Sequence, residues 1–546
     1  MWLFILAVLG GSCARAVSSS SSSSSAALLP YHHAHPGFLD ASAFPSGDGT
    51  TFRKRAARLL REARAPALAA AADARALAGA DGIINPTDYG ADPTGAADAS
   101  DAMDAAVGAL CKLGGGRVDA NGLKNLGGAV FDLSGGVYSI SRTLLFPPGY
   151  SNFRVQRGTL LAGPAWPSQT WAYLLRIGSS NSTGCGTSGG ASNKDCNSDV
   201  GVAQLTLDGS ASNAAYGGLM IENTMDANVG PAVMVTNFHG VGISLRGSGA
   251  GYVHEAWLGQ YSPGIKPPSG GAGMTATAIL LDGPQHDCDV NNVIVYSGLV
   301  GVNTTNGANR IQGVHTWNLA GSRGGTGILL QKGTGRVQQS YLDYAPLVLR
   351  GHGERTAGNI ALIEGNFFLG SATIVLQATT PADALTGTVI TGNSFNSWNA
   401  INTTFYLDER GGNAFAAVRD VVVENNEVSG ALQEAGAKKS TRATMTAPII
   451  GCVPSGSCIT NVTIDYSSVL VFGSAVGIDP FSVVCSIHSS VSPYAAYGWA
   501  FPYSTALDAA NHNAIVVTFG YATELGGLRA NVTCSVDQSV RTCAAH

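Results

Sequence analysis

Short runs of apolar residues recur along most of the chain, separated by glycine, asparagine and threonine instead of by long helical stretches. In one set of runs, which combine Gly or Ala with apolar residues, an apolar position recurs at steps of 36, 23, 26, 20 and 26: Ile243, Ile279, Val302, Ile328, Val348 and Ile374. In a second set the apolar run meets a polar turn residue: Asn237, Glu255, Asn366, Asn393 and Asn426. Two or three short strands in each step are typical of a β-solenoid, whose stacked coils bury one continuous apolar face.

This repeat predicts an all-β fold, a right-handed, single-stranded parallel β-helix. The asparagines support it, because Asn tolerates the left-handed conformation of tight turns and its amide can hydrogen-bond to the amide of the next coil. A β-sandwich is the alternative. The hairpin turns that a sandwich needs every 8–12 residues or so are not regular in this chain.

The pattern divides the chain into four parts. Residues 1–16 are predicted to be a signal peptide, because a short apolar run ends at the cleavage pattern Ala14-Arg15-Ala16. Residues 17–82 are predicted to be a disordered Ser-rich segment followed by a basic helical spacer. The β-helix is predicted for 83–444, with a helix near 98–107 covering its open end, and a C-terminal β cap with a cysteine cluster for 445–546. Caps are expected because an open end exposes unpaired strand edges.

Composition narrows the partners. Charged residues make up 12% of the chain, against about 25% for an average domain, and 71 of its 546 residues are glycine. The formal net charge of −5 excludes the general basic surface of a nucleic-acid-binding protein. No apolar run after the signal peptide is long enough to cross a membrane. We therefore expect a soluble, secreted monomer that acts outside the cell.

Two further features fit secretion. Five sequons for N-linked glycans occur, at Asn181, Asn303, Asn402, Asn461 and Asn531. Of the ten cysteines, Cys13 leaves with the signal peptide, and the remaining nine suit an oxidising compartment. Possible disulfides are Cys185–Cys196, Cys452–Cys458 and a pair among Cys485, Cys534 and Cys543, which leaves Cys111 and Cys288 as buried thiols. No Cys or His group has the spacing of a zinc site, and we predict no metal or other cofactor.

Two motifs resemble the signatures of the pectate-lyase-like β-helix superfamily, to which rhamnogalacturonase- and epimerase-like proteins belong. They are Asn85-Pro-Thr-Asp-Tyr-Gly-Ala-Asp-Pro-Thr-Gly95 and the stretch from Gly127 to Arg142. Six central segments resemble the plant Quartet-type polygalacturonases: 257–260, 297–301, 313–315, 324–328, 340–344 and 367–370. The resemblance extends over about 83 to 540. It implies pectin hydrolysis in the plant cell wall, with pollen development as one setting.

The chain departs from ordinary polygalacturonases, which carry Asn-Thr-Asp, Asp-Asp, Gly-His-Gly and Arg-Ile-Lys motifs on successive coils. Only Gly351-His352-Gly353 is present, and we interpret it as a loop. The resemblance therefore does not assign the catalytic residues, which have to be sought from their chemistry.

Cleavage of a glycosidic bond needs a proton donor and a carboxylate that activates water or attacks carbon. A polymer with one carboxylate per sugar also needs cations in its groove. In an extended chain Asp287 and Asp289 would face the same way, with Cα atoms about 6.6 Å apart, which suits an inverting hydrolase. Arg310 and Arg336 follow about one and two coils later, so we predict an Asp–Arg–Arg stack that binds substrate. The alternative is a structural ion-pair ladder.

Four other residues are candidates. Asp208 and Glu255 are the further catalytic candidates, although Asp208 could simply form an Asp-Gly turn and Glu255 could replace Asn in the turn column. His315 and Asp343 are candidates for binding the sugar, and packing inside the fold is the alternative for each.

The predicted function is a secreted glycoside hydrolase that cleaves α-1,4-galacturonan. A calcium-dependent pectate lyase is one alternative, in which acids bind Ca²⁺ and an arginine abstracts the proton. Calcium prefers six to eight oxygen ligands, and only two acids gather locally. A non-catalytic wall-binding β-helix is the other alternative, because the usual catalytic set is missing.

Overall fold

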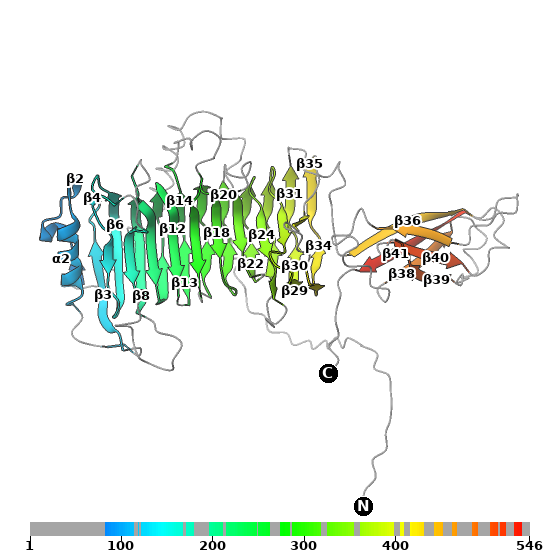
Figure 1. The fold of residues 1–546 in the computed structure, drawn as a ribbon, viewed down its shortest axis with the longest axis horizontal. Helices are drawn as coiled ribbons and strands as arrows, with labels where there is room; N and C mark the ends of the chain where they lie inside the picture. Colours follow the sequence, from blue (N-terminus) through cyan, green and yellow to red (C-terminus); the bar gives the residue numbers. More distant parts are fainter. Residues whose placement is uncertain are drawn as a thin grey trace, which may run out of the picture. The chain divides into compact units, whose positions relative to one another are not determined.

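The computed structural model confirms the predicted right-handed, single-stranded parallel β-helix (Figure 1). It describes residues 82–537 except 114–117, 120–121, 168–170, 180–195, 211–214, 248, 263–273, 284–286, 318–324, 333, 354–360, 398–404, 409–414, 431–441, 451–460, 467–482, 490–502, 511–513 and 520–528. In this part of the chain no helix combines the length and the apolarity that crossing a membrane requires.

A typical coil contributes one strand to each of three parallel ladders. The first ladder contains β1 (Ile83–Ile84), β3 (Lys124–Asp132), β6 (Tyr150–Ala162), β8 (Asn197–Asp208), β10 (Thr224–Val229), β13 (Gly251–His254), β16 (Asp289–Asn291), β19 (Arg310–Gln312), β22 (Gly335–Gln338), β26 (Ala361–Glu364), β30 (Thr388–Thr391) and β34 (Val422–Glu424).

The second ladder contains β2 (Thr94–Asp98), β4 (Val137–Ile140), the later halves of β6 and β8, β11 (Val233–Thr236), β14 (Ala256–Gly259), β17 (Ile294–Ser297), β20 (His315–Trp317), β23 (Tyr341–Asp343), β27 (Phe367–Leu369), β31 (Ser394–Ser397) and β35 (Glu427–Gly430). The third contains β5 (Leu144–Phe146), β7 (Tyr173–Gly178), β9 (Ala215–Glu222), β12 (Phe238–Arg246), β15 (Thr277–Asp282), β18 (Val300–Thr304), β21 (Thr326–Leu330), β24 (Leu347–Arg350), β28 (Ile374–Gln377) and β32 (Phe405–Asp408).

The core lies inside the coils, because alternate side chains of a strand point to opposite faces. On the first ladder one aliphatic residue per coil points inward, and each is fully buried: Val290, Ile311, Val337, Ile363, Ile390 and Val423. The residues on either side of them in each strand therefore point outward. These outward positions form straight columns along the ladder, and the candidate site is built from two such columns.

The turn between the first and second ladders is a single residue in the left-handed conformation. Gly313, Gln339 and Gly365 occupy it in successive coils, with φ of 61°, 50° and 64°. In later coils a buried asparagine follows it: Asn366 donates to Asn393 Oδ1, and Asn393 donates to Asn426 Oδ1, each at 2.9 Å. This hydrogen-bonded ladder of amides is the predicted role of Asn in the turns.

Two residues of the predicted turn column belong elsewhere. Asn237, with φ of 59°, forms the turn between the second and third ladders instead. Glu255, with φ of 48°, occupies the left-handed position itself, one residue before the position of the amide ladder. The prediction of a single column was wrong for these two, because each coil has more than one tight turn.

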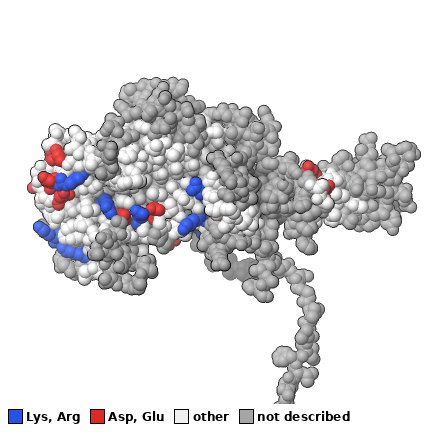
Figure 2. Space-filling model, viewed as in Figure 1, with Lys and Arg blue, Asp and Glu red and all other residues white. Residues whose placement is uncertain are grey.

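The predicted helix covers the N-terminal end of the β-helix as α2 (Ser100–Leu110), which follows the short 3-10 helix η3 (Pro86–Tyr89) (Figure 1). Met103, Ala106 and Leu110 bury its apolar face. Arg142 pairs with Asp101 and Asp104 at 2.7 and 2.6 Å. Figure 2 shows that charged patches are few on this face of the molecule, and that acidic residues gather at the end where α2 lies.

A small sheet beside the ladders contains β25 (His352–Gly353), β29 (Asp383–Thr386) and β33 (Ala417–Arg419). The C-terminal strands form two antiparallel sheets. One contains β36 (Arg442–Ile450), β38 (Val484–Ser489) and β41 (Arg529–Asp537), and the other β37 (Asn461–Asp465), β39 (Tyr503–Leu507) and β40 (Ala514–Phe519). The predicted division of the chain into four parts stays a prediction.

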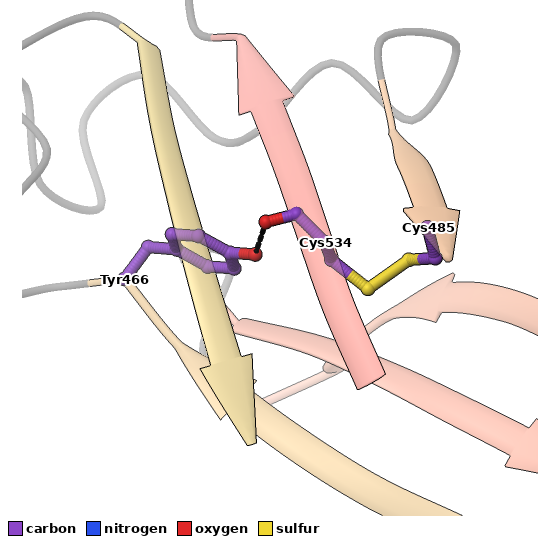
Figure 3. Close-up of a disulfide and its surroundings, with 3 residues drawn as sticks. All are labelled: Tyr466, Cys485 and Cys534. Atoms are coloured by element: carbon purple, nitrogen blue, oxygen red, sulfur yellow. Dashed lines mark hydrogen bonds between the residues drawn. A yellow bond between two sulfur atoms is a disulfide. The ribbon is translucent and has the colours of Figure 1, made fainter. Parts of the chain in front are cut away.

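One predicted disulfide is present. Cys485 and Cys534 pair between β38 and β41, and the Tyr466 hydroxyl donates to the Cys534 carbonyl at 2.6 Å (Figure 3). Cys196 is also disulfide-bonded, whereas Cys185, Cys452, Cys458 and Cys543 lie outside the described residues. Cys288 is a buried thiol as predicted, and Cys111 is only half-buried.

The glycosylation sites stay predictions. Asn303 lies in β18, half-buried, and accepts a hydrogen bond from Gln331 Nε2 at 2.7 Å. Asn461 and Asn531 lie in strands β37 and β41. Asn181 and Asn402 lie outside the described residues.

Asp383 at the start of β29 gives the fold a pH-dependent contribution. Its carboxylate accepts hydrogen bonds from the N–H and hydroxyl of Thr379, at 2.7 and 2.8 Å, and of Thr380, at 3.0 and 2.7 Å. Burial alone would raise its pKa, but these hydrogen bonds outweigh burial and lower it. Its stabilisation is therefore present above the unfolded pKa of about 3.9 and lost as pH falls through the folded value.

We expect Asp383→Asn to lower the free energy of unfolding by about 1–3 kcal/mol at pH 6, because an amide accepts these bonds less strongly than a carboxylate. The difference should shrink below about pH 4, where the native carboxylate protonates. Urea unfolding at both pH values measures it, with Asp226→Asn as the control because Asp226 is exposed. Equal losses at both pH values would contradict the hydrogen-bonded carboxylate.

Candidate functional site

An outward column of the first ladder brings together three residues that the sequence singled out. Tyr252 pairs in register with Asp289, Asp289 with Arg310, and Arg310 with Arg336. Neighbouring strands lie about 4.8 Å apart, so these four side chains stand one above the other. We call Asp289, Arg310 and Arg336 the arginine column. The Tyr252 side chain at its end is 52% exposed.

Asp289 and Arg310 form an ion pair that leaves one carboxylate oxygen without a partner. Arg310 Nε donates to Asp289 Oδ2 at 3.0 Å, and its Nη2 donates to the same oxygen. Asp289 Oδ1 is buried and has no hydrogen-bond partner in the described part of the chain. The Asp289 side chain is 7% exposed and that of Arg310 45%. The hydrogen bonds with Asp289 raise the pKa of Arg310, which keeps the guanidinium charged.

Arg336 gives the column a surplus of positive charge. Its side chain is exposed and, among the described residues, makes no hydrogen bond or ion pair. Like charges on directly paired positions destabilise a sheet. Arg310 and Arg336 are paired in this way, and the column contains one acid, Asp289, against these two arginines. A planar guanidinium that is free in this way can bind a carboxylate through two parallel hydrogen bonds.

Asp287 does not continue the strand of Asp289 as predicted. Its φ is 57°, so the chain is in a left-handed turn there, and the strand begins only at Asp289. The extended chain on which their common orientation was predicted is therefore absent at Asp287. The turn arises because Cys288 is buried and its N–H bonds to Asn309 Oδ1 at 3.0 Å. Asp287 is exposed at the edge of the column.

The second ladder carries another group on its outer side. His315 pairs with Tyr341 and Tyr341 with Phe367 in register, with ring centroids 4.6 and 5.0 Å apart. Asp343 Oδ2 lies 3.4 Å from His315 Nε2, and Asp343 Oδ1 is buried with no partner among the described residues. We call His315, Tyr341, Asp343 and Phe367 the aromatic face. Burial, together with the charge of Asp343 and a hydrogen bond to it, raises the pKa of Tyr341, so the phenol stays protonated.

The sequence predicted His315 and Asp343, the latter together with its aromatic neighbours in Tyr341-Leu-Asp-Tyr344, but missed Tyr252 and Phe367. A signal for Phe367 was present, since 315, 341 and 367 are separated by two equal steps of 26. Residues separated by equal steps of one coil lie in one column, so a search for aromatic residues at such steps would have found Phe367. Tyr252 gave no such signal, because its step to Asp289 is 37.

Asp208 ends β8 where a turn begins, and Glu255 lies in a turn. Asp208 Oδ1 accepts hydrogen bonds from the Ser210 N–H at 2.9 Å and from Asn237 Nδ2 at 2.7 Å, which are the bonds of a turn-forming aspartate. Glu255 is exposed in the one-residue turn between two ladders. Neither belongs to the arginine column or the aromatic face, and their catalytic roles stay predictions.

The described residues contain no group of three or more His, Cys, Asp or Glu side chains that could hold a metal ion. His352 of the Gly-His-Gly triplet lies in β25 of the small sheet, outside the three ladders.

Comparison with known proteins found one similar curated sequence. The chain is 30% identical over 402 residues to polygalacturonase QRT3 of Arabidopsis thaliana, which covers 73% of this chain and 76% of that protein. No family model matches the chain.

Similar solved structures include ORF18 of Geobacillus virus E2, with a TM-score of 0.44, 11% identity and coverage of 64% of this chain and 62% of that one. A mutant tailspike protein of E. coli bacteriophage HK620, in complex with pentasaccharide, has a TM-score of 0.42, 11% identity and coverage of 84% and 94%. The A-module of mannuronan C-5 epimerase AlgE4 from Azotobacter vinelandii has a TM-score of 0.38, 14% identity and coverage of 63% and 95%.

Proposed function

The chain belongs to the family of the Quartet-type polygalacturonases, and from that premise we propose that it is a secreted hydrolase that cleaves the α-1,4 bonds of polygalacturonate in the plant cell wall. The observation that carries the proposal is the arginine column. The column places two arginines and one acid on the outer side of the β-helix, where a long polymer can reach them.

Charge explains how the column would hold the polymer. Arg310 is already paired with Asp289, so it fixes the position of that carboxylate. Arg336 has no such partner among the described residues, and it is therefore the group that would bind the carboxylate of a galacturonate. The exposed Tyr252 ring at the other end of the column would pack against a neighbouring sugar.

The reaction would add water across the glycosidic bond. Asp289 would take a proton from the water that attacks the anomeric carbon, and Asp287 would donate a proton to the leaving oxygen. The Asp289 side chain keeps 7% of its surface exposed, and rotation of its carboxylate would bring an oxygen to the attacking water. The exposed position of Asp287 beside the column leaves it able to approach a bound glycan.

Secretion forms part of the proposal. It rests on the predicted signal peptide 1–16 and the five sequons, and the disulfide between Cys485 and Cys534 supports it because such bonds persist in oxidising compartments. The protein would act as a monomer on pectic polysaccharide and would need no cofactor.

The test incubates the secreted protein with polygalacturonate, with and without a chelator, and analyses the products. We expect saturated reducing ends in both samples. Unsaturated, ultraviolet-absorbing ends that disappear with chelator would instead establish the calcium-dependent lyase. Binding without cleavage under any condition would establish the wall-binding alternative.

The same assay includes Arg336→Ala and a matched control, Arg246→Ala. We expect Arg336→Ala to raise KM about tenfold with little change in kcat, because it removes a charged hydrogen bond made in the ground state and the transition state alike. Arg246 is exposed on the third ladder, a different side of the β-helix from the column, so its variant should behave as wild type. An unchanged KM for Arg336→Ala would exclude the column as the uronate site.

A further inference from the structure

The aromatic face has no role in the reaction proposed above. Its residues lie on the outer side of the second ladder, because the inward positions of the same strands are Thr316, Leu342 and Phe368, each at most 1% exposed. The rings of Tyr341 and Phe367 are half-buried and stacked, with an interplanar angle of 18°. The core therefore does not explain them, and their partly exposed ring atoms offer an apolar surface to whatever lies outside.

Asp343 is the second unusual feature of this face. It is 8% exposed, and one of its oxygens has no hydrogen-bond partner among the described residues. A buried acceptor without a donor calls for an explanation, and a bound group that donates a hydrogen bond would provide one. The side chain keeps 11% of its surface exposed, so it borders the outside. A terminal carboxylate torsion is broad and roughly two-fold, so either oxygen can turn to meet a donor.

The charge of the aromatic face is opposite to that of the arginine column. Its register neighbours on the second ladder are Ile294, Trp317, Leu369 and Ser394, none of which is a cation, and His315 is charged only when it is protonated. A uronate placed here would meet the carboxylate of Asp343. An uncharged pyranose would instead set its C–H face on the rings and donate a hydroxyl to Asp343.

The two surfaces belong to the same two coils. Arg310 and His315 lie in one coil, and Arg336 and Tyr341 lie in the next. In each coil a single left-handed residue joins the two strands, and Gln312 Nε2 donates to Gln339 Oε1 at 2.9 Å across this corner. A glycan held by the arginine column would therefore need to pass only this corner to reach the aromatic face.

We infer that the aromatic face is a subsite for an uncharged pyranose, so that the protein prefers a pectic heteroglycan in which a neutral sugar stands near a uronate over a polymer of uronate alone. The inference rests on the proposed function, because the arginine column supplies the uronate site.

The test compares two polymers that differ only at the carboxyls: polygalacturonate, and polygalacturonate whose carboxyls have been partly reduced to alcohols, which creates galactose units. Binding is measured by calorimetry in an Asp289→Asn background, so that neither polymer is cleaved. We expect the partly reduced polymer to bind about threefold to tenfold more tightly. Phe367→Ala should abolish this preference by weakening binding of the reduced polymer alone, whereas Trp171→Ala, which removes a ring that is 79% exposed, should leave it unchanged.

Asp343→Asn provides a second variant that keeps the shape of the side chain. Without the repelling charge, the unreduced polymer should bind more tightly and the two affinities should converge. Equal affinities of the unsubstituted background for both polymers, or a preference that survives Phe367→Ala and Asp343→Asn, would overturn the inference. A wrong assignment of the uronate site to the arginine column would give a different result. Arg336→Ala would then leave the binding of both polymers unchanged, while Phe367→Ala would still weaken binding of the reduced polymer.

Discussion

Replacing Asp289 by Asn will lower turnover on polygalacturonate by about 10²–10⁴-fold, the usual contribution of a general acid or base, while the β-helix remains folded. The amide keeps the size of the side chain but cannot take a proton from water. The fold should survive because the partner that loses its ion pair, Arg310, is 45% exposed and remains solvated. Initial rates of reducing-end formation measure the effect, and circular dichroism verifies the fold.

Asp132→Asn is the matched control. Asp132 lies on the same ladder with 1% of its side chain exposed, and Arg157 Nε donates to it at 3.0 Å, so it is another buried acid paired with an arginine, far from the column. It should lose stability to a similar degree and keep its turnover. Asp287→Asn tests the proposed proton donor in the same assay. Full activity of both Asp287→Asn and Asp289→Asn would refute this site and make Asp208 and Glu255 the leading acids.

The fold could be predicted because one physical constraint acts on every coil. An inward aliphatic residue must recur once per coil, and the predicted column Ile243, Ile279, Val302 and Ile328 is in register on the third ladder. The next member was wrong: Ile328 pairs with Leu347, and Val348 points outward. Both are aliphatic, so hydrophobicity alone could not distinguish the inward residue from its neighbour.

The site was less predictable, because its geometry depends on loops that differ from coil to coil. Arg310 and Arg336 could be stacked from their spacing, since their steps from Asp289 are close to one and two coils. The left-handed turn at Asp287 could not, because it depends on a hydrogen bond between Cys288 and Asn309, 21 residues away in the sequence. The orphan oxygens of Asp289 and Asp343 are also features of packing, and no sequence pattern encodes them.

The amide ladder is the feature whose loss should damage the fold most. Asn393 is fully buried, accepts hydrogen bonds from the backbone N–H and side chain of Asn366, and donates to Asn426 Oδ1 and the Ile363 carbonyl. Asn393→Leu replaces it with an apolar side chain of similar size, leaves the Asn366 N–H without its acceptor and removes one of the two hydrogen bonds of Asn426 Oδ1. A buried group without a partner costs about 1–3 kcal/mol and each further lost hydrogen bond about 1 kcal/mol, so we expect the free energy of unfolding to fall by about 3–5 kcal/mol.

Asn396→Leu in the same coil separates the loss of the ladder from the change in side-chain chemistry. Asn396 is half-buried on the outer side of the second ladder, and its side chain makes no hydrogen bond among the described residues, so its replacement should shift stability by no more than about 0.5 kcal/mol. Urea unfolding of the two variants at one pH gives the comparison. Because each coil is stabilised mainly by its neighbours, losing the bonds at one coil weakens the contacts on both of its sides. If both variants unfold at the same urea concentration, side-chain amides do not hold the coils together, and the stability of the stack resides in its aliphatic core and backbone ladders alone.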